Sequence, residues 1–195
     1  MATQVPLERR LGGVSVRIGG ETAPLFAVGP GQINAQVPFA AVPGSTGAVV
    51  VESNGKLSAP QNYLIAPVQP NVFEEDGLAV VTDPEGRRIN SENPALTGEV
   101  LQISATGLGL VDQPVATGAA SPAASTVLSP VRVKIGGIDA PVSYQGLAPG
   151  LVGRYQINVF LSGLVQPGDE VTVTIEQNGI PSNAGSPVSI PVRNP

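Results

Sequence analysis

The feature that most constrains this chain is an internal duplication, because one short sequence module occurs twice. The segment VSVRIGGETAPL (14–25) matches VRVKIGGIDAPV (131–142) at 7 of 12 positions. Gln-Ile-Asn then follows at 32–34 in the first copy and at 156–158 in the second. Motifs that recur in the same order indicate two copies of one folded module.

Both copies have the pattern of short antiparallel strands. Residues 131–135 alternate apolar with basic side chains, which predicts a strand with one buried and one solvated face. Residues 43–58 match 167–182 at 7 of 16 positions. Each of these segments contains Asn-Gly, at 54–55 and at 178–179, and this dipeptide is the strongest short hairpin signal.

Composition leaves little room for helix. The 195 residues include 24 glycines and 20 prolines, yet 42% of the chain is hydrophobic. Frequent Gly and Pro interrupt helices, while the apolar content is too high for a disordered segment. We therefore predict an all-β chain of two tandem immunoglobulin-like β-sandwich modules.

The repeat also predicts the domain boundaries. The first module takes residues 1–68 and includes an N-terminal arm, residues 1–10. The second takes residues 69–195 and begins with a connecting hairpin, residues 69–92. That hairpin is expected to turn at Asp83-Pro84-Glu85-Gly86, a sequence typical of tight turns.

The first module is expected to lack its opening strand. Residues 93–115 supply this strand and the turn after it to the second copy, and no similar segment precedes the first. A sandwich without an edge strand exposes apolar side chains and unpaired backbone groups. The candidates to fill the gap are the arm (1–10), the connector (69–92) and a strand from a neighbouring molecule.

Residue content excludes several classes of function. The chain has no cysteine and no histidine, which removes disulfides, zinc sites built on Cys or His, and triads that need His. The net charge is −5 and Lys56 and Lys134 are the two lysines, so we expect no nucleic-acid partner. No apolar run reaches the roughly 20 residues of a membrane span. The start, MATQVPLERR, lacks the apolar stretch of a signal peptide, as in a mature, trimmed or cytoplasmic chain.

One loop is a candidate binding site. Seven residues separate Pro24 from Gln32, whereas fourteen separate Pro141 from Gln156. The longer loop carries Tyr and Arg, residue types favoured at binding hot spots, although tyrosines also pack at sandwich edges. The candidate partner or ligand residues in it are Tyr144, Gln145, Arg154 and Tyr155.

Other polar groups have a structural explanation. Glu74-Glu75-Asp76, Asp83 and Glu85 offer oxygen atoms to calcium, but their spacing differs from that of an EF-hand loop, and solvated turns explain them better. The repeated Gln and Asn of Gln-Ile-Asn are expected to satisfy neighbouring polar groups or to face water. We predict no catalytic residue, no metal site and no cofactor, and hence no enzyme.

The ordered motifs LGGVSVRIGG, GQINAQVP, GEVLQISATGLG, VRVKIGG and PGDEVTVTI together resemble a known family over nearly the whole chain. This is the acidobacterial (Solibacter-type) uncharacterised C-terminal domain family of secreted proteins, whose copies are in turn similar to IPT/TIG-type immunoglobulin-like domains. The resemblance implies an immunoglobulin-like fold and a location outside the cell or on its surface. It implies no activity, because none is established for the family.

These observations favour a non-catalytic extracellular module with a structural or adhesive role, whose partner is a protein or a cell-surface polymer. One alternative is a filament subunit that self-assembles by donating a strand between molecules. The other alternative is a carbohydrate- or protein-binding module that uses the loop at 144–155.

Overall fold

The computed structural model describes residues 1–123 and 125–195, and none of them is helical. The described chain divides into two compact units. Unit 1 contains residues 1–67, 114–123 and 149–153, and unit 2 contains the other described residues. The predicted all-β class is confirmed.

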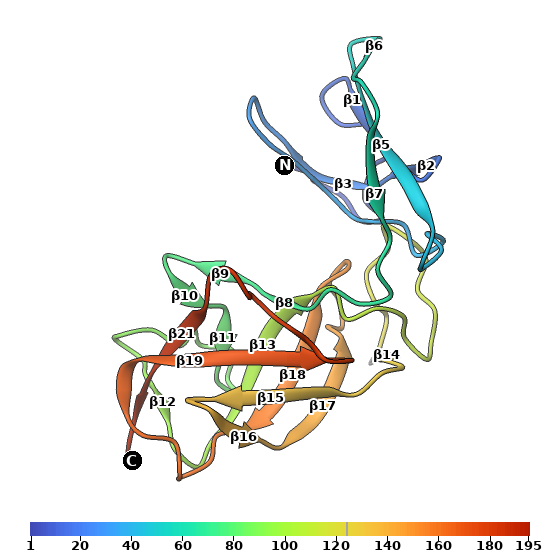
Figure 1. Cartoon of the computed structure of the whole chain (residues 1–195). Helices are drawn as coiled ribbons and strands as arrows, with labels where there is room; N and C mark the ends of the chain where they lie inside the picture. Colours follow the sequence, from blue (N-terminus) through green and yellow to red (C-terminus); the bar gives the residue numbers. More distant parts are fainter. Residues whose placement is uncertain (124) are drawn as a thin grey trace. The chain divides into compact units, whose positions relative to one another are not determined.

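Unit 2 is a sandwich of two sheets (Figure 1). One sheet has the order β11-β13-β18-β17-β14, with β8 also on β13. The other has the order β16-β15-β19-β21-β10-β9, with β12 on β21 and β20 on β19. The first sheet consists of β8 (Asn71–Val72), β11 (Val81–Thr82), β13 (Val100–Thr106), β14 (Ser125–Thr126), β17 (Val142–Leu147) and β18 (Tyr155–Phe160). The second consists of β9 (Glu74–Glu75), β10 (Leu78–Ala79), β12 (Ala95–Leu96), β15 (Val131–Ile135), β16 (Ile138–Ala140), β19 (Gly168–Gln177), β20 (Ile180–Pro181) and β21 (Val188–Arg193).

The core of unit 2 follows from strand alternation. Every second side chain of the long strands is buried, because successive residues of a strand point to opposite faces of the sheet. Fully buried members of this core are Leu101, Ile103, Ile157, Val159, Ile175 and Ile190. Both sheets contribute to this set, so the apolar faces of the two sheets are what hold unit 2 together.

Unit 1 has the same plan with fewer strands. One sheet has the order β2-β1-β5-β6 with β7 also on β5, and the other is the pair β3-β4. The strands are β1 (Val14–Ile18), β2 (Glu21–Ala23), β3 (Leu25–Val28), β4 (Ile33–Ala35), β5 (Thr46–Ser53), β6 (Lys56–Leu57) and β7 (Gln61–Leu64). A small buried cluster of Val16, Ile18, Ala23 and Leu25 forms its centre.

The duplicated motifs form the same elements in both units. Strands β1 to β7 correspond to β15 to β21, in order, and β1 pairs with β5 in the register in which β15 pairs with β19. The pairs β3-β4 and β17-β18 even share a register shift, which directly follows Leu25↔Ala35 in unit 1 and Val142↔Val159 in unit 2. Asn54-Gly55 and its counterpart both have positive φ at the two central positions, as a type I′ hairpin turn requires.

The connector, residues 69–92, belongs to unit 2 and serves both of its sheets. Strands β8 and β11 pair with β13, whereas the β9-β10 hairpin joins the other sheet through a parallel pairing of β10 with β21. The expected turn is present, since Gly86 N donates to Asp83 O at 3.0 Å. The connector is thus more than one hairpin, and of the three candidates to fill the gap in the first module it is not the one that does so, because its strands pair within unit 2.

The N-terminal arm lies along β3. Leu25 N donates to Glu8 O at 2.8 Å, and Ala2 N donates to Phe26 O at 2.7 Å. The side chain of Leu7 is buried. The arm therefore contributes to unit 1, but it pairs with β3 and leaves the far edge of β4 free.

Two later segments also belong to unit 1, although the sequence-based boundary assigned them to the second module. Gly118 N, in residues 114–123, donates to Gln36 Oε1 at 2.7 Å, and Leu7 N donates to Gly118 O at 2.8 Å. A parallel bridge between Ser121 and Pro149 attaches residues 149–153 to the same segment. Neither segment carries a strand, so periodicity gives no sign of this placement.

Candidate functional site

Tyr144 and Gln145 of the predicted loop residues lie on strand β17. The Tyr144 hydroxyl donates to Leu147 O at 2.7 Å, and burial raises the pKa of this phenol. Gln145 Oε1 accepts a hydrogen bond of 2.6 Å from Val131 N. Both side chains have partners within unit 2 and so help to hold the edge of the first sheet.

Tyr155 is the first residue of β18, where it pairs with Leu147 of β17, and Arg154 directly precedes it. The Arg154 guanidinium donates to the Ser104 hydroxyl and lies 5.8 Å from the centre of the Phe73 ring. The Tyr155 hydroxyl donates to Gly109 O, and burial raises the pKa of Tyr155 to about 12. The four predicted side chains bond to different partners, Leu147 and Val131 for Tyr144 and Gln145, and Ser104 and Gly109 for Arg154 and Tyr155, so no side-chain hydrogen bond in the described residues joins them into one patch.

The acidic residues of the connector lie in the short strand β9 and in the turns that follow it. Asp83 accepts hydrogen bonds from Arg87 N at 2.8 Å and from Arg87 Nε at 2.7 Å. Burial raises the pKa of Asp83, but the bonds from Arg87 and Asn93 outweigh it and the net shift is downward. Among the residues that the structure describes, no three acidic side chains gather as a metal site requires.

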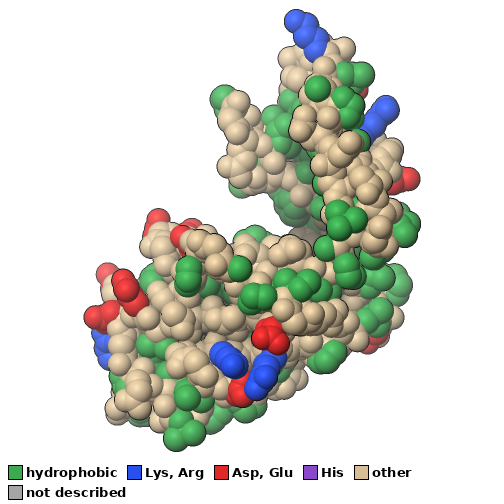
Figure 2. Space-filling view, in the orientation of Figure 1, with side chains coloured by type: hydrophobic (Ala, Val, Ile, Leu, Met, Phe, Trp, Pro, Cys, Tyr) green, Lys and Arg blue, Asp and Glu red, His purple; other side chains and the backbone are tan. Residues whose placement is uncertain are grey.

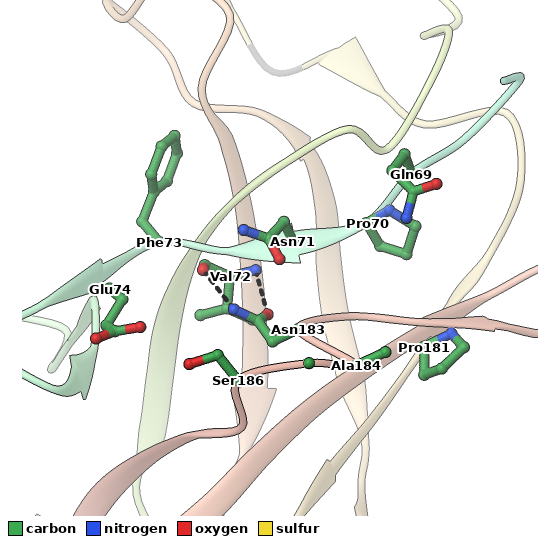
Figure 3. Close-up of a pocket in the computed structure, with 11 residues that line it drawn as sticks. Gln69, Pro70, Asn71, Val72, Phe73, Glu74, Pro181, Asn183, Ala184 and Ser186 are labelled. Atoms are coloured by element: carbon green, nitrogen blue, oxygen red, sulfur yellow. Dashed lines mark hydrogen bonds between the residues drawn. The ribbon is translucent and has the colours of Figure 1, made fainter. Parts of the chain in front are cut away.

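A solvent-open groove of about 560 Å³ lies beside β8 in unit 2 (Figure 3). The Asn183 side chain reaches across it to the backbone of Val72: Oδ1 accepts from Val72 N at 2.8 Å, and Nδ2 donates to Val72 O at 3.2 Å. These bonds satisfy the outward backbone groups of this edge residue. The groove is therefore a place where unit 2 closes its own sheet edge, and its polar groups face one another.

Among the described residues no strand pairs with the far edge of β4 in unit 1, although just beyond the strand Phe39 N donates to the Thr117 hydroxyl at 3.0 Å. Gln36 N donates to Pro24 O at 2.9 Å, on the side of β3. Since backbone groups alternate in direction along a strand, the N–H groups of Ile33, Ala35 and Val37 point away from β3. Within the described residues, β4 pairs with β3 alone.

The second copy shows what belongs at this edge. Phe160 N donates to Pro141 O at 2.9 Å, the same bond that Gln36 makes in unit 1. On its other side β18 pairs with β13 over six residue pairs, from Val100↔Phe160 to Ala105↔Tyr155. Within the described residues β4 has no counterpart of β13 beside it, as expected for a first module without its opening strand.

Burial at the matched positions differs accordingly. Val37 is 54% exposed, while its counterpart Leu161 is 0% exposed. Ile33 and Ala35 are partly exposed, and their counterparts Ile157 and Val159 are fully buried. The apolar side chains along β4 are thus suited to a covering strand but are covered by none in the described chain.

Gln-Ile-Asn itself behaves alike in both copies. Gln32 Nε2 donates to Asn34 Oδ1 at 2.6 Å, and Gln156 Nε2 donates to Asn158 Oδ1 at 2.8 Å. The two amides satisfy each other along the polar face of the strand. The motif therefore has a local structural role, and the difference between the copies arises from the neighbouring strand.

A second edge of unit 1 is open at β7, but it is less suited to a partner. The corresponding strand β21 pairs with β10 and β12, each only two residues long. On β7, Gln61 and Asn62 are exposed and polar, and only Leu64 at its end presents an exposed aliphatic side chain. The β4 edge combines apolar side chains with free backbone groups and is the stronger candidate.

Charge near the candidate edge is low. No charged residue occurs between Glu21 and Glu52, a stretch that contains β3, β4 and most of β5. Figure 2 shows scattered basic and acidic side chains on the visible face, without a concentration of basic ones. Charged side chains on natural edge strands often prevent pairing with another chain, and β4 carries none.

Comparisons with known proteins give no assignment. No protein-family model matches the chain, and no curated protein matches it. In the described residues, no helix has the length and apolar character needed to cross a membrane.

Proposed function

We propose that this chain is a non-catalytic immunoglobulin-like module with a structural or adhesive role, and that it joins a partner polypeptide by strand addition at the β4 edge. The observation that carries this proposal is the unpaired far edge of β4, compared with the paired edge of β18. In strand addition, backbone hydrogen bonds supply affinity and the alternate side chains supply specificity. The β4 edge offers both kinds of group.

The setting of the edge supports an adhesive role. Unit 2 has an extensive buried core, and its strand β18 is paired on both sides, so it is suited to carry unit 1 as a stable support. The extracellular or cell-surface location rests on the resemblance to secreted proteins of the acidobacterial family. A cell-surface polymer as the partner is less well supported, because the free groups at β4 are backbone amides and aliphatic side chains.

The two alternatives differ in how the structure bears on them. A filament subunit would use the same β4 edge, with the added strand coming from another copy. The loop at 144–155 remains a prediction; it is tested by Tyr144→Ala and Arg154→Ala, which would abolish binding to a glycan or protein if that loop were the site.

The proposed function is tested by selecting partners for the edge without assuming their sequence. A displayed library of short random peptides is panned on the full chain, and the binders are tested on Val37→Asp and on Leu164→Asp. Both replaced side chains are exposed, so both variants should fold. We expect binders that lose affinity for Val37→Asp by about tenfold or more and keep it for Leu164→Asp. Failure to select any binder sensitive to Val37→Asp would refute strand addition at β4.

A further inference from the structure

We infer that the strand accepted by β4 is supplied from outside residues 1–195, lies antiparallel to β4, and carries neutral apolar side chains at every second position in the manner of β13. This inference rests on the proposed function and specifies the chemistry of the partner. It follows from the duplication, because unit 2 contains the completed form of the site that is open in unit 1.

The register of the completed site is known from β13 and β18. The pairs Leu101↔Val159 and Ile103↔Ile157 place two aliphatic side chains of β13 against two of β18. All four of these side chains are fully buried. Beyond this, Leu161 N donates to Glu99 O at 2.9 Å, which fixes the start of β13 against the end of β18.

The same register is available along β4. The duplication places Ala35 where Val159 stands, Ile33 where Ile157 stands, and Val37 where Leu161 stands. A partner strand in this register sets two apolar side chains opposite Ala35 and Ile33 and accepts a hydrogen bond from Val37 N. Burial of aliphatic groups on both strands then stabilises the complex, at about 25 cal/mol per Å² of apolar surface.

The apolar edge disfavours partner strands that carry charged side chains. A carboxylate or ammonium group opposite Ile33 or Ala35 would lose its hydration, and no charged residue between Glu21 and Glu52 is available to pair with it. Neutral apolar side chains at these two positions carry no such cost. The edge therefore discriminates by charge as well as by shape.

A second copy of the chain is a poor donor. Each described strand of unit 2 already pairs within a sheet, and β13 is held on both of its edges, by β18 and by β8 and β11. The N-terminal arm is hydrogen-bonded to β3 in its own unit. Donation by a second copy would require one of these pairings to break, whereas an extended segment outside residues 1–195 binds without that loss.

The test uses the β13 sequence as the probe. A blocked synthetic peptide of residues 97–108, TGEVLQISATGL, is titrated into the full chain, beside a control peptide with Leu101→Asp and Ile103→Asp. Amide hydrogen exchange is followed at Ile33, Ala35 and Val37, where a bound strand slows exchange. We expect protection at these amides, with affinity for the control peptide weaker by about tenfold or more.

Matched measurements assign the effect to β4. Val37→Asp should lose binding of the peptide, Leu164→Asp should retain it, and exchange at Ile157 should not change. Equal binding of the two peptides, or binding that survives Val37→Asp, would overturn the inferred chemistry. If neither peptide binds while the random library still gives binders sensitive to Val37→Asp, the inference fails and the proposed function stands.

The source of the strand is tested by the mass of the protein alone. Light scattering over a concentration series should give the monomer mass of 19.7 kDa throughout. Mass that grows with concentration in the unmodified chain, and not in Val37→Asp, would make a second copy the occupant and overturn the inference that the strand lies outside residues 1–195.

Discussion

Strands β4 and β18 differ less in sequence than in surroundings. Both contain Gln-Ile-Asn, both pair with the preceding strand through the same register shift, and both form the same bond between the Gln and Asn side chains. On β18 the next strand buries Ile157, whereas on β4 the equivalent Ile33 stays partly exposed. The comparison teaches that a strand and its turn are set locally, while burial depends on what lies beside the strand.

The largest expected effect comes from the same substitution at the two matched isoleucines. Ile157→Ala removes a fully buried side chain and should lower the free energy of unfolding of unit 2 by about 3–4 kcal/mol. Ile33→Ala should cost unit 1 about 1 kcal/mol, because its side chain is already partly solvated. Residue-resolved hydrogen exchange in rising urea measures each unit separately. Equal losses would mean that β4 is as well covered as β18, contrary to the comparison.

A smaller effect is expected at Asp83, which anchors a turn of the connector in unit 2. Its pKa is lowered in the folded chain, so the stability it contributes is present above the ordinary carboxyl pKa and is lost as the pH falls through the lowered value. Asp83→Asn should therefore weaken unit 2 at pH 7 and flatten its loss of stability below pH 4. Unfolding followed at both pH values measures this, with unit 1 as the internal control. An acid response of unit 2 that is unchanged by Asp83→Asn would show that other groups cause it.

The smallest effect is expected at two tyrosine hydroxyls, one in each unit. The Tyr155 hydroxyl donates to Gly109 O, and Tyr155→Phe should cost unit 2 about 1 kcal/mol. The Tyr63 hydroxyl in unit 1 is buried without a hydrogen-bond partner among the described residues, and Tyr63→Phe should be neutral or slightly stabilising. Thermal unfolding of both variants gives the comparison. A clear loss of stability in Tyr63→Phe would reveal a partner for that hydroxyl.

The elements that could be predicted from the sequence are those with a local cause. Alternation along 131–135 predicts β15, and Asn178-Gly179 predicts its hairpin turn, because each depends on residues next to one another. The missing opening strand was also predictable, since the second copy serves as a reference for the first. The candidate edge was therefore found by comparing the two copies, because β18 has a strand beside it at the place where the described residues give β4 none.

What could not be predicted depends on distant contacts or on very short elements. Strands β9 to β12 have two residues each, too few to show an alternation of apolar and polar residues. No sequence pattern therefore indicated that the connector divides between two sheets. Residues 114–123 join unit 1 through isolated hydrogen bonds, such as that from Gly118 N to Gln36 Oε1, which no local sequence motif predicts. The predicted loop residues were chosen by type, and their placement on or beside the paired strands β17 and β18, each with its own hydrogen-bond partner, follows only from the sheet order and the packing.

The inclusion of residues 114–123 and 149–153 in unit 1 has a consequence for the making of the protein. A ribosome releases the chain from its N-terminus, and a domain whose parts are contiguous folds as soon as its last residue emerges. Unit 1 must instead wait for residue 153, by which point only 154–195 of unit 2 remain to be synthesised. Unit 1 is thus completed almost as late as unit 2, although its strands come first in the chain. During most of translation its exposed β4 edge coexists with strands of the same chain that have not yet paired.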